Sequence, residues 1–446
     1  MFNANYRFDD FDPPIPFLTG DASDLHSIIS EVQRVENLSK DEIRERQRLH
    51  LKTLMSHFSK VSSNFRGRLR TNFPETSKDL TLPNLLALVE PQDKFYFQSI
   101  YKDIRESKVP KHHLPLHSAR TSGSTGVPLK VRCTAINRAI GMAQLPWTHL
   151  KSGTDFSWRM ASVKPSNTVL KECGEWDPAT SLLFRVGPML SVPTSLDVFT
   201  QLEELEKFRP DLLIIFPSVL KEYVSIWGSG KRNPLQLKVI RTLGETLSDE
   251  VRKMAGEATG ANVLDTYSSS EVGRIATQVS PEGVYTVNNY SLIVEVLDEG
   301  GKRCKPDEIG RVVITDLFNF ATPLVRYDIG DWAIPADDFH HTLSSIKGRS
   351  RNMISLPNGN KVWPLVGYRE FSEVVPIRQF HIRQTSPEAL QANFFVESTP
   401  SEKDEESLRK IICESLGYGF TITFAYQNAP LKKLPNQKLE DFVSLV

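Results

Sequence analysis

The sequence contains few cysteines and no long apolar stretch. Four cysteines occur among the 446 residues, and they show neither a CxxC pair nor the Cys/His spacing of a structural zinc site. No run of about 18 apolar residues predicts a transmembrane helix. The opening MFNANYRFDDFDPPIPF has early acids and prolines in place of the apolar core of a signal peptide. Together with the isolated thiols, these absences predict a cytoplasmic protein without a membrane partner.

Net charge is also absent, because 54 lysines and arginines balance 54 aspartates and glutamates. A global positive field that would attract nucleic acid is therefore missing. The basic segments RERQRLHLK and RGRLR have no interleaved aromatic residues, so we interpret them as a solvated helix face and expect no nucleic-acid partner. The composition is that of a globular protein, and the length predicts two or three domains in a monomer or homodimer.

Hydrophobic periodicity changes along the chain. Residues 24 to 70 are predicted to be helical, with apolar positions such as Ile28 and Val32 at helical spacing. From about residue 115, short β-branched strands alternate with helices, in PLKVRCT, DLLIIFPSVL, LKVIRTLGE and ANVLDTYSS. Such alternation indicates a parallel sheet. After residue 283 the segments GVYTVNN, SLIVEVLD and GRVVITDL predict a β-rich part.

The last hundred or so residues are predicted to form a separate small unit. IRQFHIRQT, LQANFFVES and GFTITFAYQ are predicted strands, and EKDEESLRKIICESL is a predicted amphipathic helix. The predicted fold class is α/β: a large N-terminal domain with parallel-sheet and β-rich subdomains, plus a small mobile α+β C-terminal domain. The expected divisions are a helical region at 1–80 packed on the large domain at 81–349, and a lid domain at 350–446.

A glycine-rich segment carries the strongest chemical signal. TSGSTGVPLKV, residues 121 to 131, places two glycines among four hydroxyl residues before a predicted strand. Glycines let successive backbone N–H groups converge on an anion, and hydroxyls add donors to phosphate oxygens. The segment is not the Walker pattern, because GxxxxGK[ST] is missing. Taken alone, it is also compatible with a polar loop between strands.

Six segments in order, TSGSTG, TLGET, YSSSEVG, RYDIGD, KGRSRNMI and a near-terminal QKLEDFV, resemble those of the adenylate-forming (acyl-CoA synthetase) superfamily. The resemblance runs from about residue 80 to the end and is strongest to the phenylacetate-CoA ligase and capsule-biosynthesis ligase-like branch. It implies that ATP activates a carboxylic acid as an acyl-adenylate, with release of pyrophosphate. Coenzyme A is the default acyl acceptor, and an amine or a carrier-protein thiol is the alternative. The expected substrate is an aryl or arylalkyl acid.

Two alternatives to an adenylating enzyme stay open at this point. The first is a non-catalytic nucleotide-binding homologue, which the departures Val127, Arg351 and Gln437 from the family pattern would suit. The second is a phosphotransferase that moves the γ-phosphate of ATP.

The resemblance implies that the glycine-rich segment holds the β- and γ-phosphates of ATP. The residues assigned to it are Ser122, Gly123, Ser124, Thr125 and Gly126, with Thr125 also placed near a magnesium ion. Many relatives carry lysine where this chain has Val127, so the loop has less positive charge.

In YSSSEVG, Glu271 matches the metal-binding carboxylate of the family, and Ser270 beside it is assigned to nucleotide binding. Mg²⁺ prefers hard oxygen ligands and takes one or two carboxylates together with phosphate oxygens. The alternative for Glu271 is a carboxylate that caps nearby amides at a helix start. We predict that Glu271 is the magnesium ligand and a catalytic residue.

Three residues are assigned to the adenine base. Tyr267 would offer an aromatic face, and Gly244 and Glu245 in TLGET would lie along the base, since glycine permits close approach of the backbone. The alternative for TLGET is a plain strand-to-helix turn. The candidate pocket for the acid is FPSVL, with Phe216 or Ser218 in its lining, although both residues fit a core position equally well.

Ribose and hinge residues follow in the next two segments. In RYDIGD, Asp331 matches the ribose-binding aspartate, because a carboxylate accepts from both ribose hydroxyls. Arg326 and Asp328 are considered as a structural ion pair. In GRSRNMI, Arg349 would reach ribose or phosphate, and Arg351 occupies the hinge position where the family has Asp or Lys.

The near-terminal segment supplies the predicted catalytic lysine. In LKKLPNQKLEDFV, Gln437 replaces the usual glycine and Lys438 takes the lysine position, with Lys432 and Lys433 as competitors. Adenylation brings a carboxylate onto an anionic α-phosphate, so a cation must be delivered there. The zinc ligands that branch members carry after the glutamate are missing from VGRIATQVSPEGVYTVNN, so no zinc is predicted.

Overall fold

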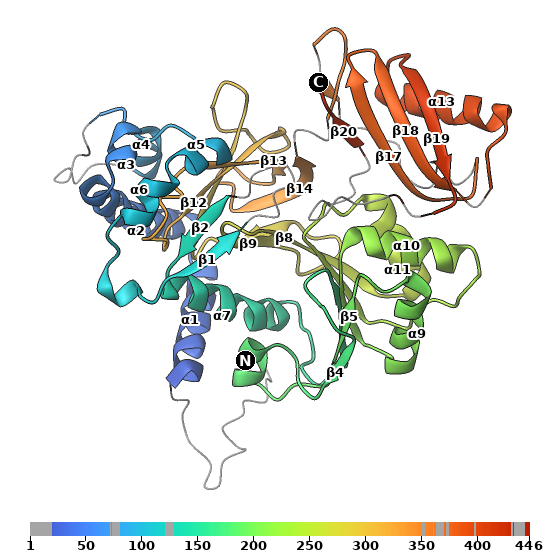
Figure 1. Cartoon of the computed structure of the whole chain (residues 1–446). Helices are drawn as coiled ribbons and strands as arrows, with labels where there is room; N and C mark the ends of the chain where they lie inside the picture. Colours follow the sequence, from blue (N-terminus) through green and yellow to red (C-terminus); the bar gives the residue numbers. More distant parts are fainter. Residues whose placement is uncertain are drawn as a thin grey trace.

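The computed structural model of the chain describes residues 20–71, 73, 81–120, 129–349, 353–359, 361–362, 370–371, 374–396, 398–429, 431 and 442–446 (Figure 1). Within these ranges, every helix is too short or too polar to span a bilayer. A large body carries the N-terminal helices and one extended sheet, and a second sheet with its own helix follows at the C-terminal end.

The predicted helical region is confirmed by helices α1 (Gly20–Glu36), α2 (Lys40–Val61) and α3 (Ser63–Gly67). Helix α2 begins at a capping box, in which Glu42 N–H donates to the Ser39 hydroxyl and the Glu42 carboxylate accepts from Ser39 N–H. The buried face of α2, with Leu51 and Phe58, packs on the β-rich part of the large sheet. The short helices α4 (Leu82–Ala87), α5 (Lys94–Ser99) and α6 (Tyr101–Glu106) follow.

One twelve-stranded sheet organises the large body, in the order β11-β12-β13-β14-β10-β9-β8-β7-β6-β3-β5-β4. Its parallel strands are β3 (Met160–Lys164), β5 (Met189–Pro193), β6 (Leu212–Ile215), β7 (Val239–Leu243) and β8 (Asn262–Ser269), with β4 (Lys171–Cys173) antiparallel at the edge. The antiparallel part comprises β9 (Gly273–Thr277), β10 (Tyr285–Val287), β11 (Leu292–Leu297), β12 (Gly310–Asp316), β13 (Tyr327–Pro335) and β14 (Thr342–Arg349). The predicted α/β class, with parallel and β-rich parts, is confirmed.

Helices cover both faces of the parallel strands (Figure 1). One face packs on α9 (Val198–Phe208), α10 (Pro217–Gly228) and α11 (Asp249–Thr259). The other face packs on α1, α7 (Ala135–Lys151) and α8 (Pro178–Leu183). A parallel sheet buried on both faces is normally apolar on both, so a polar side chain on either face needs a physical reason.

Two strand predictions differ from the structure. PLKVRCT forms β2 (Lys130–Cys133), which pairs antiparallel with β1 (His117–Arg120) in a separate two-stranded sheet instead of joining the parallel one. Only the first half of DLLIIFPSVL is a strand, because Pro217 suits the first turn of a helix and starts α10. Strands β3 and β5 were not predicted.

The C-terminal sheet has the order β19-β18-β17-β20. Its elements are β17 (Ile377–Ser386), β18 (Ala389–Val396), α13 (Glu402–Leu416), β19 (Thr421–Gln427) and β20 (Phe442–Ser444), preceded by the small pair β15 (Ile354–Ser355) and β16 (Lys361–Val362). The three predicted strands and the predicted helix are confirmed, and β20 is an addition. Gln379 of β17 donates to Glu222 of α10 at 2.7 Å, so this sheet contacts the large body beside α10.

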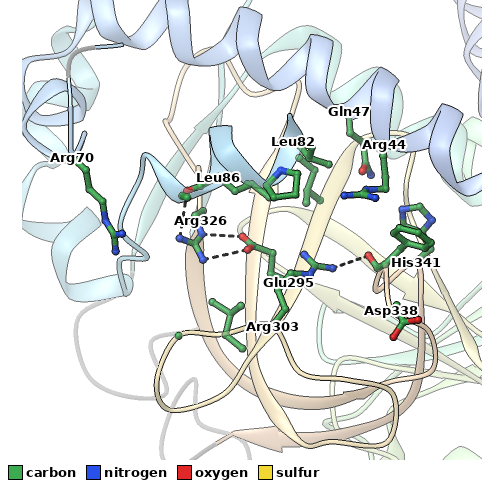
Figure 2. Close-up of a pocket in the computed structure, with 16 residues that line it drawn as sticks. Arg44, Gln47, Arg70, Leu82, Leu86, Glu295, Arg303, Arg326, Asp338 and His341 are labelled. Atoms are coloured by element: carbon green, nitrogen blue, oxygen red, sulfur yellow. Dashed lines mark hydrogen bonds and ion pairs between the residues drawn. The ribbon is translucent and has the colours of Figure 1, made fainter. Parts of the chain in front are cut away.

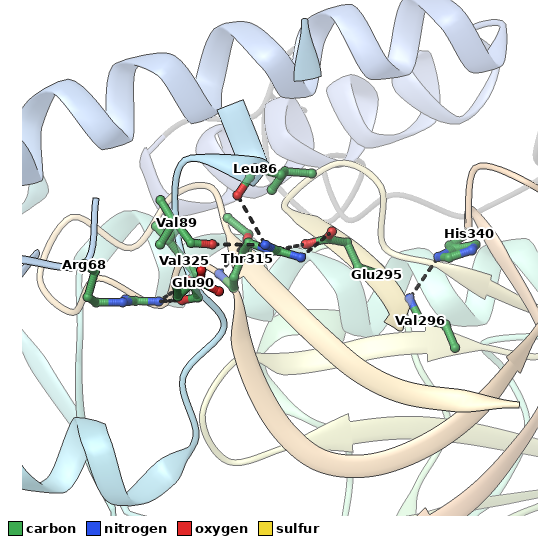
Figure 3. Close-up of polar contacts among 10 residues, drawn as sticks. Arg68, Leu86, Val89, Glu90, Glu295, Val296, Thr315, Val325 and His340 are labelled. Atoms are coloured by element: carbon green, nitrogen blue, oxygen red, sulfur yellow. Dashed lines mark hydrogen bonds and ion pairs between the residues drawn. The ribbon is translucent and has the colours of Figure 1, made fainter. Parts of the chain in front are cut away.

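A buried ion pair joins the segment around α4 to the large sheet (Figure 3). Arg326 Nε and Nη2 donate to the two oxygens of Glu295 at 2.9 and 3.2 Å, and Arg326 Nη1 donates to Val89 O at 3.0 Å. The pair that we considered between Arg326 and Asp328 was wrong. Asp328 lies two residues further along β13 and binds Arg311 at 2.6 Å. The guanidinium of Arg326 therefore has a structural role.

Replacing Arg326 with methionine should be strongly destabilising. The change leaves the Glu295 carboxylate, which is 3% exposed, without its cation, and breaking such buried pairs costs about 3–5 kcal/mol. The free energy of unfolding in urea measures the loss. Arg232→Met, which removes the solvated Arg232–Glu206 pair, is the control and should cost no more than about 1 kcal/mol. Equal losses would contradict the role given to Arg326.

Candidate functional site

The described site residues gather at one edge of the sheet. Phe216 and Ser218 follow β6, Gly244 and Glu245 follow β7, and Tyr267 lies near the end of β8. Because β6, β7 and β8 are parallel, their carboxyl ends meet at the same edge. In open α/β sheets, ligands bind outside this edge.

The turns after β6 and β7 contact one another. Gly244 has φ +79°, and a Cβ on it would lie 2.7 Å from an atom of the Phe216 ring. Ser218 N–H at the start of α10 donates to Glu245 Oε2 at 2.9 Å, which gives this helix a carboxylate cap that Phe216 cannot supply. Glu245 therefore fixes the turn geometry. The adenine and acid-pocket roles of these four residues stay predictions.

Tyr267 and Arg349 both contact Asp331, the predicted ribose residue. The Tyr267 hydroxyl donates to Asp331 Oδ2 at 2.8 Å, and Arg349 Nε lies 3.6 Å from Asp331 Oδ1. Asp331 and Arg349 are paired residues of β13 and β14, so backbone register holds them together. Burial, and then the Asp331 charge, raise the pKa of Tyr267, which keeps the hydroxyl protonated as the donor. The ring of Tyr267 is 7% exposed and lies in the core between β8 and β13.

Glu271 lies in the turn between β8 and β9 and is buried, whereas Ser270 beside it is exposed. The Tyr327 hydroxyl donates to Glu271 Oε1 at 3.0 Å. Burial raises the pKa of Tyr327, and the Glu271 charge adds to this, so the phenol stays a donor. Tyr327 was not predicted, although it stands inside the quoted RYDIGD segment. The motif gave no signal that its side chain would reach back to Glu271.

The donors at Glu271 fit a magnesium ion better than a metal with many protein ligands. Within the described ranges, no cluster of three or more His, Cys, Asp or Glu side chains suits a metal ion. Mg²⁺ usually keeps several waters and takes one or two carboxylates with phosphate oxygens. One buried carboxylate held by a phenol is compatible with that mode of binding.

Several predicted residues lie outside the described ranges. They are Ser122, Gly123, Ser124, Thr125, Gly126, Arg351, Lys432, Lys433 and Lys438. The glycine-rich segment is bounded by paired strand residues, since Arg120 of β1 is the register partner of Lys130 of β2.

A separate cavity of about 320 Å³ lies beneath α2, against α4 and β11 (Figure 2). Arg44, Glu295, Arg303 and Arg326 are among its lining residues. Its floor is the Arg326–Glu295 ion pair described above, and its lining residues differ from those gathered at the carboxyl edge. We assign it to the packing of the N-terminal helices.

The chain has the fold of adenylate-forming enzymes. A 2-hydroxyisobutyryl-CoA ligase in the postadenylation state, in complex with 2-HIB-AMP, superposes with a TM-score of 0.71 over 92% of this chain and 91% of that structure, at 16% identity. The amide bond synthetase McbA from Marinactinospora thermotolerans superposes with a TM-score of 0.51 over 73% and 67% of the two chains, also at 16% identity.

In sequence, the chain is similar to the phenylacetate-coenzyme A ligase of Pseudomonas putida. The two are 23% identical over 231 residues, which are 48% of this chain and 52% of the ligase, so the match spans about half of that relative. No protein-family model matches the chain. The resemblance to the adenylate-forming superfamily that six segments indicated is thus confirmed.

Substituting alanine at Gly244 should destabilise the protein by more than the same change at Gly260. Both glycines have positive φ, +79° and +72°, but only at Gly244 would the Cβ meet a neighbour, the Phe216 ring. Gly260→Ala should cost about 1–2 kcal/mol from backbone strain alone, and Gly244→Ala about 1–3 kcal/mol more from overpacking. Urea unfolding of both variants measures the difference. Equal losses would show that the ring does not pack against this turn.

Proposed function

We propose that the protein activates a carboxylic acid with ATP, forming an acyl-adenylate and pyrophosphate, and then transfers the acyl group to an acceptor. The observation that carries the proposal is the convergence of Tyr267, Glu271, Asp331 and Arg349 beside the carboxyl ends of the parallel strands. These four residues come from three of the segments that resemble the superfamily. Their arrangement suits a nucleotide lying across this edge.

Asp331 suits the ribose because its carboxylate offers more lone pairs than Tyr267 uses. One oxygen accepts from the Tyr267 hydroxyl, and the carboxylate retains capacity for two ribose hydroxyls. Arg349 stands on the neighbouring strand, with its side chain 40% exposed, and can donate to ribose or phosphate. Gly244 leaves the backbone free to approach the base.

Glu271 is the proposed magnesium ligand. The ion, when bound, would supply positive charge to the β- and γ-phosphates, and Thr125 of the glycine-rich segment is its second proposed contact. The Tyr327 hydroxyl fixes one oxygen of Glu271 and so sets the direction of the carboxylate. Ser122 to Gly126 would cradle the same phosphates through backbone N–H groups.

In the first step, an oxygen of the substrate carboxylate attacks the α-phosphorus, and the bond to the β-phosphate oxygen breaks with its electron pair leaving on pyrophosphate. Lys438 would stabilise the charge that develops on the α-phosphate oxygens. In the second step, a nucleophile attacks the acyl carbon, and AMP leaves. Domains 1–80, 81–349 and 350–446 are the proposed units, with the last rotating about Arg351 between the steps.

Coenzyme A is the proposed acceptor, and an aryl or arylalkyl acid the proposed substrate. Both follow from the similarity to a phenylacetate-coenzyme A ligase. An amine or a carrier-protein thiol is the alternative acceptor, since an amide bond synthetase shares the fold. We place the reaction in the cytoplasm.

Exchange of labelled pyrophosphate into ATP tests the proposed function directly. Exchange that depends on an added acid requires a reversible acyl-adenylate. A phosphotransferase would release ADP instead. A non-catalytic homologue would neither catalyse the exchange nor release ADP. A panel of aromatic and aliphatic acids identifies the substrate class, and product analysis with coenzyme A or amines then identifies the acceptor.

Replacing Glu271 with glutamine should reduce acid-dependent exchange by about 100-fold or more, because the amide cannot neutralise the metal and phosphate charges. The fold should stay intact, since glutamine keeps an acceptor for the Tyr327 hydroxyl. Glu282→Gln, an exposed carboxylate in the loop between β9 and β10, is the matched control and should leave exchange unchanged. Near-normal exchange by folded Glu271→Gln would remove the metal assignment.

Lys438→Ala should slow formation of the acyl-adenylate far more than acyl transfer from adenylate that is supplied ready-made. The reason is that Lys438 is proposed to act in one transition state only. Single-turnover rates of the two half-reactions measure the difference. Lys432→Ala and Lys433→Ala are the matched controls. If either control, and not Lys438→Ala, shows the selective loss, the lysine assignment moves to that residue.

A further inference from the structure

A second group of polar residues lies just below the carboxyl edge, on the face of the sheet that packs on α7. Lys164 is the last residue of β3, and its neighbour Val163 pairs with Ile215, the last residue of β6. Arg241 lies on β7 three residues before Gly244, and Arg274 on β9 is the register partner of Ser268. All three positions share the face that Met160, Leu212 and Val239 turn toward α7.

These cations interrupt an otherwise apolar face. Burial of a parallel sheet on both sides favours continuous hydrophobic residues, so charged residues on the same face of the three alternate strands β9, β7 and β3 call for a physical reason. The facing part of α7 is polar as well, with Gln144, Thr148 and His149 all less than a tenth exposed. A polar compartment therefore exists between α7 and the sheet, adjacent to the edge that carries Gly244 and Glu271.

Several nitrogen atoms in this compartment lack partners. Arg241 Nε, Arg274 Nε and His149 Nδ1 are buried and find no hydrogen-bond partner among the described residues. The Lys164 ammonium forms no side-chain hydrogen bond or ion pair with the described residues. Leaving such groups buried and unpaired is costly, so native proteins rarely keep them without a ligand or ordered water.

The protein's own carboxylates compensate for little of this charge. The charge of Asp177 acts on Lys164 and Arg274, but its oxygens accept from Ala179 N, Thr180 N and the Thr180 hydroxyl at the start of α8. Asp265, which interacts with Arg241, is bound to the Thr242 and Tyr285 hydroxyls. Burial lowers the pKa of Arg241 to about 9 and that of Arg274 to about 10, as expected for cations without a close counter-ion.

Arg274 is oriented for a planar anion. Among the described residues, its side-chain hydrogen bonds go from Nη1 to Gln144 O and to the Thr148 hydroxyl. The edge formed by Nε and Nη2 is therefore unused by the described residues. Arg326 binds both oxygens of Glu295 through the same edge, so the protein contains an example of the geometry that Arg274 has available.

We propose that the acid activated by this protein carries a second carboxylate, which Arg274, Lys164 and Arg241 bind in the compartment between α7 and the sheet. The inference rests on the proposed function and specifies its substrate class. One carboxylate of the diacid stands at the edge, where it is adenylated, and the other lies below, where it supplies the missing counter-charge. Selection then follows from charge: a neutral end placed in the compartment leaves the cations unpaired.

Paired acids with the same skeleton test this inference: hexanoic and adipic, benzoic and terephthalic, phenylacetic and 4-carboxyphenylacetic acid. In acid-dependent pyrophosphate exchange, we expect kcat/KM for the preferred diacid to exceed that of its partner by about tenfold or more, since a neutral end would leave the cations without a hydrogen-bonded counter-ion. Lys164→Met should abolish the preference without unfolding the protein, because the Lys164 ammonium makes no hydrogen bond to the described residues. Lys171→Met, on the exposed edge strand β4, is the control and should keep it.

Calorimetric titration of the same acids without ATP separates the possible failures. Exchange with monoacids that equals or exceeds exchange with diacids, or a diacid preference that survives Lys164→Met, overturns the inference and leaves the proposed function standing. Diacid binding that requires Lys164 but supports no exchange upholds the anion site and overturns the proposed function. Absence of both binding and exchange for every diacid overturns both.

Discussion

The hydrogen bond from Tyr267 to Asp331 joins the two halves of the large sheet at the place where the proposed nucleotide lies. Tyr267 ends the parallel part and Asp331 belongs to the antiparallel part, 64 residues further along the chain. Both groups are held by strand register, and burial keeps the phenol protonated. Because the contact is fixed by backbone pairing, ribose recognition would need little rearrangement on binding. The other site residues are placed relative to this junction.

The arginines in the interior of this protein are of two kinds. One kind has a structural role, and the other has a proposed role in ligand binding. The guanidinium of Arg326 donates to both oxygens of Glu295 and to the carbonyl of Val89, and it joins the α4 segment to the sheet. Arg241 is equally buried and Arg274 is partly buried, but the Nε atoms of both are buried without a partner among the described residues, and both residues lie next to the carboxyl edge. Burial of either kind of guanidinium costs desolvation free energy. Only the unpaired Nε atoms of Arg241 and Arg274, however, can still bind a ligand. The same reasoning assigns the cavity beneath α2, whose floor is the satisfied pair, to packing.

The sequence motifs predicted which residues form the candidate site, but not the contacts among them. The resemblance to the superfamily predicted Gly244 and Asp331 as residues of one nucleotide site, whereas spacing alone favoured a plain turn at Gly244. Tyr327 was missed because its partner is 56 residues away and no local pattern encodes that contact. The sequence did contain a signal at Arg241, because this arginine lies within the apolar strand LKVIRTL. Helical or strand periodicity alone does not say what such an arginine does.

The fold was predictable where local pattern and burial agree. The three long strands and the helix of the C-terminal sheet alternate clearly, whereas β20 has only three residues and depends on pairing with β17. PLKVRCT has strand composition, but composition does not choose between a parallel sheet and a hairpin.

A crystal structure with a sulfamoyl analogue of an aryl acyl-adenylate tests the central claim most directly. The account predicts that the ribose hydroxyls donate to Asp331, that the adenine lies along Gly244, and that the sulfamoyl group stands near Glu271. An adenylate bound elsewhere, with Asp331 still contacting only protein groups, would contradict it.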